Sequence, residues 1–193
     1  MCGFSGFIGS IYSLSELKTL ITTSIRLLHH RGPDQKGSFV SPVAAFGTTR
    51  LAIQDPQNGK QPMTFNEYTL VYNGELYNAP VLRDKLKSKG YLFKTTSDTE
   101  VLLYALCEFG ESILIELEGM FAFAFWNAKL QSLLLARDRW GEKPLFYCQY
   151  ENSLTFASEI KAIFCFPHIR NGIDEDDLMW FQKNSYLPNQ KTG

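Results

Sequence analysis

The stretch Met120-Phe121-Ala122-Phe123-Ala124-Phe125-Trp126 alternates large with small side chains and is apolar on both of its faces. A strand of this kind has to be buried on both faces, between two layers of structure. Further strands, joined by hairpins, are predicted downstream at residues 133–136, 145–150 and 154–157, with Asn152 in one turn. The run therefore predicts a sheet that lies inside a layered domain.

Helical segments alternate with other predicted strands. Ser13 with Glu16, and Ser97 with Glu100, have the spacing of capping boxes that start helices. Strands are also predicted at residues 2–8, 39–49 (interrupted at Pro42) and 69–72, and helices between Ser13 and Gly32, Asn78 and Gly90, Ser97 and Gly110, and from Asp174 to about Lys183. This order predicts an α+β fold in which two antiparallel sheets pack together and helices cover them outside.

The composition is that of one ordinary globular domain, with 193 residues, 45% of them hydrophobic and 20% charged. The formal net charge is -1 and Lys and Arg are scattered, which argues against nucleic acid or an anionic membrane as a partner. Cys107, Cys148 and Cys165 are isolated and lack metal-ligand spacing. They predict reduced thiols in a cytoplasmic protein that binds no metal.

Cys2 is the second residue, so removal of Met1 would leave a thiol and a free α-amine on one residue. A thiol that attacks an unactivated carboxamide needs a nearby base, and an α-amine with a pKa of about 7.7 to 8.0 is partly neutral at cellular pH. Most cysteines are nevertheless small buried hydrophobic residues. Position alone leaves both roles open.

Asn73-Gly74 follows a predicted strand, and this dipeptide is typical of a hairpin turn. The functional alternative is an oxyanion hole, because an Asn amide and a following glycine N–H can direct two donors at one oxygen. Glycine would also let the backbone approach a ligand closely. Taken alone, the dipeptide favours the turn.

Two charged residues at the ends of predicted elements also have two interpretations. Arg50 is either an exposed or ion-paired charge or a bidentate partner for a carboxylate. Asp98 is either stabilised by the free N–H groups of its helix or a partner for an ammonium group. For His29-His30-Arg31-Gly32-Pro33-Asp34 we favour a structural loop, rigidified by Pro33 and ion-paired through Arg31 and Asp34, over a catalytic cluster.

Together these motifs run in one order along nearly the whole chain, and in that order the chain resembles the glutaminase domain of the asparagine synthetases. These enzymes are class II glutamine amidotransferases, within the N-terminal nucleophile hydrolases. The segments that carry the resemblance are Met1–Gly3, His30–Asp34, Arg50–Ile53, Gly59–Met63, Tyr72–Asn78, Ser97–Glu100, Leu117–Phe123, Ala136–Arg139 and Phe156–Lys161.

The resemblance implies a four-layer α/β/β/α sandwich, the N-terminal nucleophile hydrolase fold. It implies that Cys2 is the nucleophile and that its α-amine is the base. It places the oxyanion hole at Asn73 and Gly74, the α-carboxylate of glutamine at Arg50 and the α-ammonium at Asp98. The other pocket residues that it implies are Leu51, Ala52, Ile53, Gln54 and Glu75.

The resemblance also implies a division of the chain near residue 185. Residues 1–185 would form the glutaminase domain, which hydrolyses L-glutamine to glutamate and ammonia through a Cys2 thioester without a cofactor or a metal. Residues 186–193 would begin a linker to a synthetase domain in cis, which would use ATP and Mg²⁺ to amidate aspartate to asparagine. Whether two copies form a homodimer is left open.

Two alternatives remain at this point. A related amidotransferase with a sugar or peptide acceptor would use the same nucleophile, although the segments 30–34 and 137–147 look more like the asparagine synthetases. A non-catalytic regulatory module would retain Met1, because the blocked α-amine could not act as the base.

Overall fold

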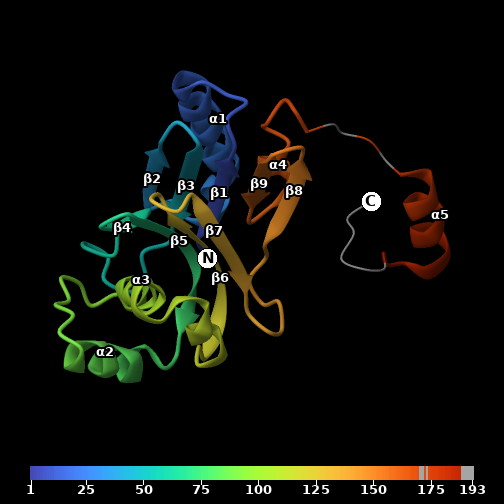
Figure 1. Cartoon of the computed structure of the whole chain (residues 1–193). Coiled ribbons are helices and arrows are strands. Elements are labelled where there is room, and N and C mark those ends of the chain that lie inside the picture. Colours follow the sequence, from blue (N-terminus) through green and yellow to red (C-terminus); the bar gives the residue numbers. More distant parts are fainter. Residues whose placement is uncertain (170–171, 173, 188–193) are drawn as a thin grey trace.

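The structure, a computed structural model, describes residues 1–169, 172 and 174–187. Two antiparallel sheets lie at its centre and helices cover them (Figure 1). The strands are β1 (Gly3–Ile8), β2 (Gln35–Val40), β3 (Ala44–Arg50), β4 (Met63–Phe65), β5 (Tyr68–Leu76), β6 (Gly119–Asn127), β7 (Ser132–Arg137), β8 (Phe146–Tyr150) and β9 (Ser153–Ala157). The helices are α1 (Leu14–Leu27), η1 (His29–Arg31), α2 (Ala79–Ser88), α3 (Asp98–Phe109), η2 (Gly110–Ile115), α4 (Ile160–Ile163) and α5 (Glu175–Asn184).

The first sheet has the strand order β2-β3-β1-β9-β8 and the second has the order β4-β5-β6-β7. Every neighbouring pair is antiparallel. α1 and α4 lie beside the first sheet, and α3, with α2 beyond it, lies beside the second (Figure 1). The predicted α+β sandwich with two packed antiparallel sheets is confirmed.

The buried strand β6 explains why the layers form. Its large residues Phe121, Phe123 and Phe125 pack in the core that α2 and α3 share with the second sheet. Ala122 and Ala124, which alternate with them, lie in the core between the two sheets. Because successive side chains point to opposite faces, small residues on one face admit the neighbouring sheet while phenylalanines fill the space under the helices.

Helix α1 starts as the sequence predicts. Ser13 accepts a hydrogen bond from the N–H of Glu16, whose carboxylate accepts one from the N–H of Ser13, so the capping box is complete. Leu17 and Ile21 on this helix are fully buried against the first sheet. A single apolar helix face therefore supplies one outer layer.

Two local predictions are wrong. Strands β7 and β8 are not joined by a hairpin, because they belong to different sheets and the chain passes from one sheet to the other between them. The second capping box is only half formed, since Ser97 accepts from the N–H of Glu100 but the Glu100 carboxylate accepts from the N–H groups of Lys94 and Thr95 instead. Glu100 thus fixes the loop before α3.

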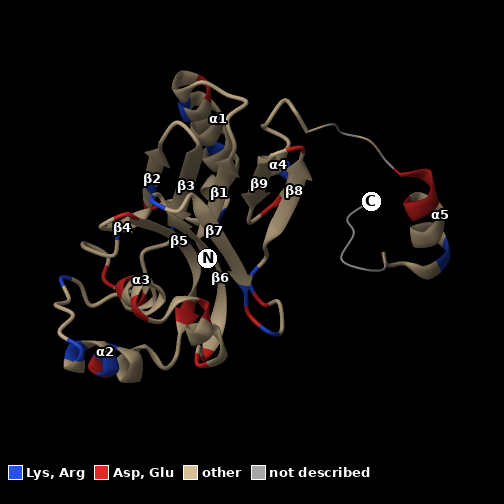
Figure 2. Ribbon diagram, viewed as in Figure 1, with Lys and Arg blue, Asp and Glu red and all other residues tan. Residues whose placement is uncertain are grey.

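The tail contains the predicted helix, α5, which Asp174 caps by accepting N–H bonds from Asp176 and Asp177. Most of the expected linker, residues 188–193, lies outside the described residues. Acidic and basic residues occur together on α1, α2 and α5 (Figure 2). None of the helices in the described ranges is both long enough and apolar enough to cross a membrane.

Candidate active site

Cys2 immediately precedes β1, the middle strand of the first sheet, and lines a cavity of about 120 Å³. Its thiol donates a long hydrogen bond, of 3.7 Å, to the carbonyl oxygen of Leu51. Its own carbonyl oxygen accepts a hydrogen bond of 3.0 Å from Nε of Arg31. Burial raises the pKa of the Cys2 thiol, an effect that the nearby charge of Arg50 partly opposes.

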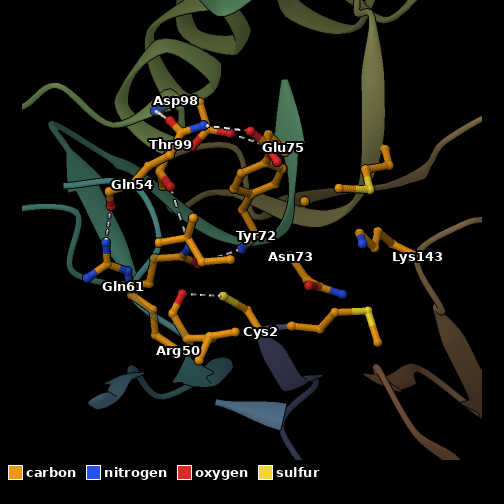
Figure 3. A pocket seen from close by; sticks show the side chains of 15 residues that line it. Cys2, Arg50, Gln54, Gln61, Tyr72, Asn73, Glu75, Asp98, Thr99 and Lys143 are labelled. Carbon is orange, nitrogen blue, oxygen red and sulfur yellow. Dashed lines mark hydrogen bonds between the residues drawn. The ribbon is translucent and has the colours of Figure 1, made fainter. Parts of the chain in front are cut away.

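The cavity brings together residues that are far apart in the sequence (Figure 3). All the residues predicted for the site line it except Ala52, whose N–H donates to the carboxylate of Asp34 instead. Leu51 and Ile53 line it from the loop that follows β3. The backbone of Ala52 thus anchors the loop to Asp34, and the role of Ala52 as a pocket residue stays a prediction.

Arg50 ends β3 and is 5% exposed, which excludes the alternative of a surface charge. Its guanidinium donates to the carbonyl oxygens of Gln54 at 2.6 Å, Asp55 at 2.9 Å and Pro56 at 3.2 Å. A guanidinium has five N–H donors, so these three bonds leave others for a ligand. Arg50 therefore holds the loop after β3 as well as contributing a positive charge to the cavity.

Asp98, at the start of α3, contributes a buried carboxylate. Its Oδ2 accepts hydrogen bonds from the hydroxyl of Tyr72 at 2.9 Å and the N–H of Leu76 at 3.0 Å. Burial raises the pKa of Asp98, while these hydrogen bonds oppose the rise. Burial and the Asp98 charge together raise the pKa of the Tyr72 hydroxyl well above its ordinary value. Asp98 is thus a fixed acceptor with its partners already arranged.

Gln54 and Glu75 complete the polar side of the cavity. The side-chain oxygen of Gln54 accepts from the N–H of Asp98 at 3.3 Å, and its amide nitrogen donates to Glu75 at 3.3 Å. Figure 3 shows these residues grouped at one side of the cavity, with Lys143 at another. Polar side chains from β5, α3 and the loop after β3 therefore converge.

The hairpin turn expected at Asn73-Gly74 is wrong. Both residues lie inside β5, where they pair with Ala122 and Phe121 of β6. A Cβ on Gly74 would collide with the carbonyl oxygen of Met120, so glycine is required by the close approach of the neighbouring strand. The dipeptide is thus part of the cavity wall and no turn forms there.

Asn73 is only 1% exposed, yet one of its polar side-chain atoms makes no hydrogen bond in the described structure. Its side-chain amide nitrogen is buried and has no hydrogen-bond partner among the described residues. A buried donor without a partner costs about 1 to 3 kcal/mol, and native structures contain few of them. Because Asn73 lines the same cavity as Cys2, this donor is available to a ligand there.

Several further residues line the cavity, among them Gln61 and Lys143. Gln61 accepts a hydrogen bond from the N–H of Tyr72 at 2.7 Å and donates to Thr99 at 3.5 Å, and so connects β5 to α3. Lys143 is 7% exposed, and its ammonium group has no hydrogen bond or ion pair within the described part of the chain. Neither residue falls in a periodic pattern, and the only sequence signal was their presence in the segments 59–63 and 137–147.

The loop His29–Asp34 is structural, as favoured, but its partners differ from those expected. Arg31 pairs with Glu159 at 3.0 Å rather than with Asp34. Asp34 accepts the N–H of Ala52 at 2.8 Å. The loop therefore supports the two chain segments that carry Cys2 and the residues after Arg50, since Arg31 also donates to the Cys2 carbonyl oxygen.

The raised pKa of Cys2 predicts its reactivity in the chain that retains Met1. Only the thiolate reacts with iodoacetamide, so the rate of Cys2 alkylation should rise about tenfold per pH unit from about pH 7 to about pH 8.5. Mass spectrometry of the N-terminal peptide would measure the rate, with glutathione as the control. A plateau of the Cys2 rate below about pH 8 would contradict the raised pKa.

No group of three or more His, Cys, Asp or Glu side chains in the described ranges is placed to hold a metal ion. The cavity instead combines a thiol, an unpaired amide donor and buried charges of both signs. This combination suits covalent chemistry on a small zwitterionic molecule.

Comparison with protein families agrees with this chemistry, because the model described as a glutamine amidotransferase domain matches residues 1–193. The chain belongs to the glutamine amidotransferase family. Two curated relatives are glutamine-hydrolysing asparagine synthetases. Asparagine synthetase 3 of Bacillus subtilis is 41% identical over 92% of this chain, and asparagine synthetase 2 of Arabidopsis thaliana is 39% identical over 84% of it. This amidotransferase domain spans only 30% and 28% of their respective lengths.

Solved structures share the fold of this amidotransferase domain. A glutamine phosphoribosylpyrophosphate amidotransferase from B. subtilis superposes with a TM-score of 0.70 at 24% identity, covering 85% of this chain and 43% of that chain. A structure described as the allosteric regulatory enzyme of purine biosynthesis gives a TM-score of 0.68 at the same identity and coverage. These matches support the four-layer sandwich independently of the sequence relatives.

Proposed function

We propose that this domain hydrolyses the side-chain amide of L-glutamine to glutamate and ammonia, with Cys2 as the nucleophile. The observation that carries the proposal is the buried, unpaired amide nitrogen of Asn73 in the cavity that the Cys2 thiol also lines. An oxyanion that forms next to Cys2 would give this nitrogen the acceptor that it lacks. Preorganised donors of this kind act where charge develops in the transition state.

The chemistry requires that Met1 is removed, so that the Cys2 α-amine is free. This amine would take the thiol proton while Sγ attacks the carboxamide carbon, and Asn73 and the N–H of Gly74 would stabilise the tetrahedral oxyanion. The proton would then pass to the amide nitrogen, the C–N bond would break, and ammonia would leave a thioester on Cys2. Water would hydrolyse the thioester, which yields glutamate and restores the thiol.

The two charged residues would orient glutamine at its other end. Arg50 has N–H donors left after its bonds to the loop carbonyls, and these would bind the α-carboxylate. Asp98, with Glu75 and Gln54 beside it, would bind the α-ammonium. Leu51 and Ile53 would contribute apolar wall. The opposite charges at this side match a zwitterion whose amide extends toward Cys2.

The reaction that consumes the ammonia would take place outside this domain. Because the curated relatives are named asparagine synthetases, we propose amidation of aspartate, with ATP and Mg²⁺ held by a synthetase domain in cis. Residues 1–185 would then be the glutaminase domain, and residues 186–193 the start of a linker. A sugar or peptide acceptor is the alternative, and a cytoplasmic location stays a prediction.

One experiment addresses both the activity and the state of Met1. Mass spectrometry would give the fraction of chains that begin at Cys2, and a coupled assay would measure glutamate release by the same sample. Release in proportion to the processed fraction is expected, because Met1 lines the cavity and blocks the α-amine when it is retained. Absence of glutamate from a fully processed sample would refute the proposal, whereas a sample that retains Met1 and releases no glutamate is the result expected of a regulatory module.

A further inference from the structure

The backbone of Cys2 is held by a side chain of η1. Nε of Arg31 donates to the carbonyl oxygen of Cys2 at 3.0 Å, and the Arg31 side chain is only 9% exposed. The contact is tight, since a Cβ on Gly3 would lie 3.0 Å from Cδ of Arg31. The position of the Arg31 guanidinium therefore fixes where the chain at residues 2 and 3 lies.

Arg31 in turn depends on one carboxylate. Its Nη1 donates to Oε1 of Glu159 at 3.0 Å, and its Nη2 is buried without a hydrogen-bond partner among the described residues. No other ion pair involves Arg31 in the described part of the chain. Removing one partner of a buried charge pair leaves the other uncompensated, which drives it toward new acceptors. Loss of the Glu159 charge would thus displace Arg31.

Glu159 is itself strongly fixed as an anion. Burial alone would raise the pKa of its carboxyl, but hydrogen bonds from Lys161, Arg31 and His30 lower this pKa to about 2. Lys161 and His30 are half exposed, with side chains 50% and 53% accessible, so solvent weakens their contribution to holding it. The Arg31 link is the one that is shielded from solvent.

Ser158, the residue before Glu159, links the same segment to the start of β1. Ser158 is fully buried, its hydroxyl oxygen accepts the N–H of Phe4 at 3.0 Å, and its own N–H donates to the Phe4 carbonyl oxygen at 2.8 Å. The segment 158–159, at the end of β9, therefore holds residues 2–4 at two points, one through backbone and hydroxyl and one through Arg31.

From this chain of contacts we propose that Glu159 is a positioning residue. Through Arg31, its carboxylate fixes the carbonyl group of Cys2 and so the direction in which the Cys2 thiol enters the cavity. The inference rests on the proposed role of Cys2 as a nucleophile. Glu159 does not line the cavity, so its influence on the reaction has to pass through Arg31.

Glu159→Gln keeps the size of the side chain and removes its charge. We expect kcat for glutamine hydrolysis to fall between about tenfold and about a hundredfold, because a small displacement of a reacting group is costly. KM should change less than about twofold, since Arg50 and Asp98 are not in contact with Glu159. The matched control is Lys161→Met, which removes an exposed partner of the same carboxylate and should leave kcat and KM unchanged.

A double-mutant cycle separates positioning from general destabilisation. Arg31→Met should lower kcat, and adding Glu159→Gln to it should lower kcat no further, because the two residues act in series. Additive losses would overturn the proposal, as would a Glu159→Gln variant with the kcat of the wild type.

Hydrogen exchange supplies a readout that does not depend on activity. In Glu159→Gln the amides of residues 3–8 should exchange faster while those of α3 keep their protection. Unchanged exchange at residues 3–8 would overturn the positioning role. Faster exchange in a domain whose wild type releases no glutamate would instead reject the proposed function and leave the structural link intact.

Discussion

Cys2→Ala is expected to abolish glutamate release from glutamine while glutamine still binds. The substitution removes the thiol that would form the thioester, and no other nucleophile of comparable reactivity lines the cavity among the residues that the structure describes. The groups proposed to bind the two charged ends of glutamine, Arg50 and Asp98, keep their own hydrogen bonds to the loop and to β5. Their arrangement does not depend on the thiol.

A coupled glutamate assay and calorimetric titration with glutamine would measure the two properties on one preparation. Cys148→Ala is the matched control, because Cys148 is a half-buried free cysteine on β8 outside the cavity. It should retain the wild-type rate. Hydrolysis by Cys2→Ala at more than about a hundredth of the wild-type rate would exclude Cys2 as the nucleophile, whereas loss of binding alone would place Cys2 in substrate recognition.

Asn73→Ala should slow turnover about a hundredfold with little loss of stability. A donor in an oxyanion hole contributes about 3 kcal/mol to transition-state stabilisation. The Asn73 amide nitrogen has no partner in the described structure, so its removal breaks no hydrogen bond and ends the cost of a buried unpaired donor. Rate and stability should therefore respond differently to this one substitution.

Asn78→Ala is its matched control, with the opposite expectation. The Asn78 side chain donates to the carbonyl oxygen of Glu116 at 2.7 Å and accepts the N–H of Glu118 at 3.2 Å, outside the cavity. Its removal should lower the free energy of unfolding by about 1 to 2 kcal/mol and leave kcat unchanged. Thermal unfolding would measure the stability of both variants, and steady-state kinetics would measure their kcat. A large loss of stability in Asn73→Ala with a normal kcat would contradict the role of Asn73 in the oxyanion hole.

The layers of the fold were predictable because one periodic signal determines them. The run Met120–Trp126 is apolar on both faces, and only a strand between two layers buries both. The passage of the chain between β7 and β8 was not predictable in the same way. The short segment between β7 and β8 looks locally like a hairpin connection. Which sheet each strand joins depends on packing across the sandwich, which no local pattern encodes.

The candidate site was predictable where a residue belongs to a segment of the family resemblance, and less so from local chemistry. Asn73-Gly74 has a strong hairpin-turn signal, yet pairing with β6 over the length of β5 overrides that preference. Gln61 and Lys143 were missed because their place at the cavity depends on tertiary contacts. Glu159 lies far from Arg31 in the sequence, so no spacing pattern could predict that the two residues form an ion pair.

The three hydrogen bonds from Arg50 to residues 54–56 end on main-chain carbonyl oxygens, which every amino acid possesses. A substitution at Pro56 therefore preserves its acceptor, whereas the insertion or deletion of a single residue moves the acceptors out of reach. Asp55 has a further role in the loop, because its carboxylate accepts the N–H groups of Asn58 and Thr96. The length of this loop is therefore more constrained than the identity of its side chains. To alter the pocket, side chains of the loop should be exchanged without changing the number of its residues.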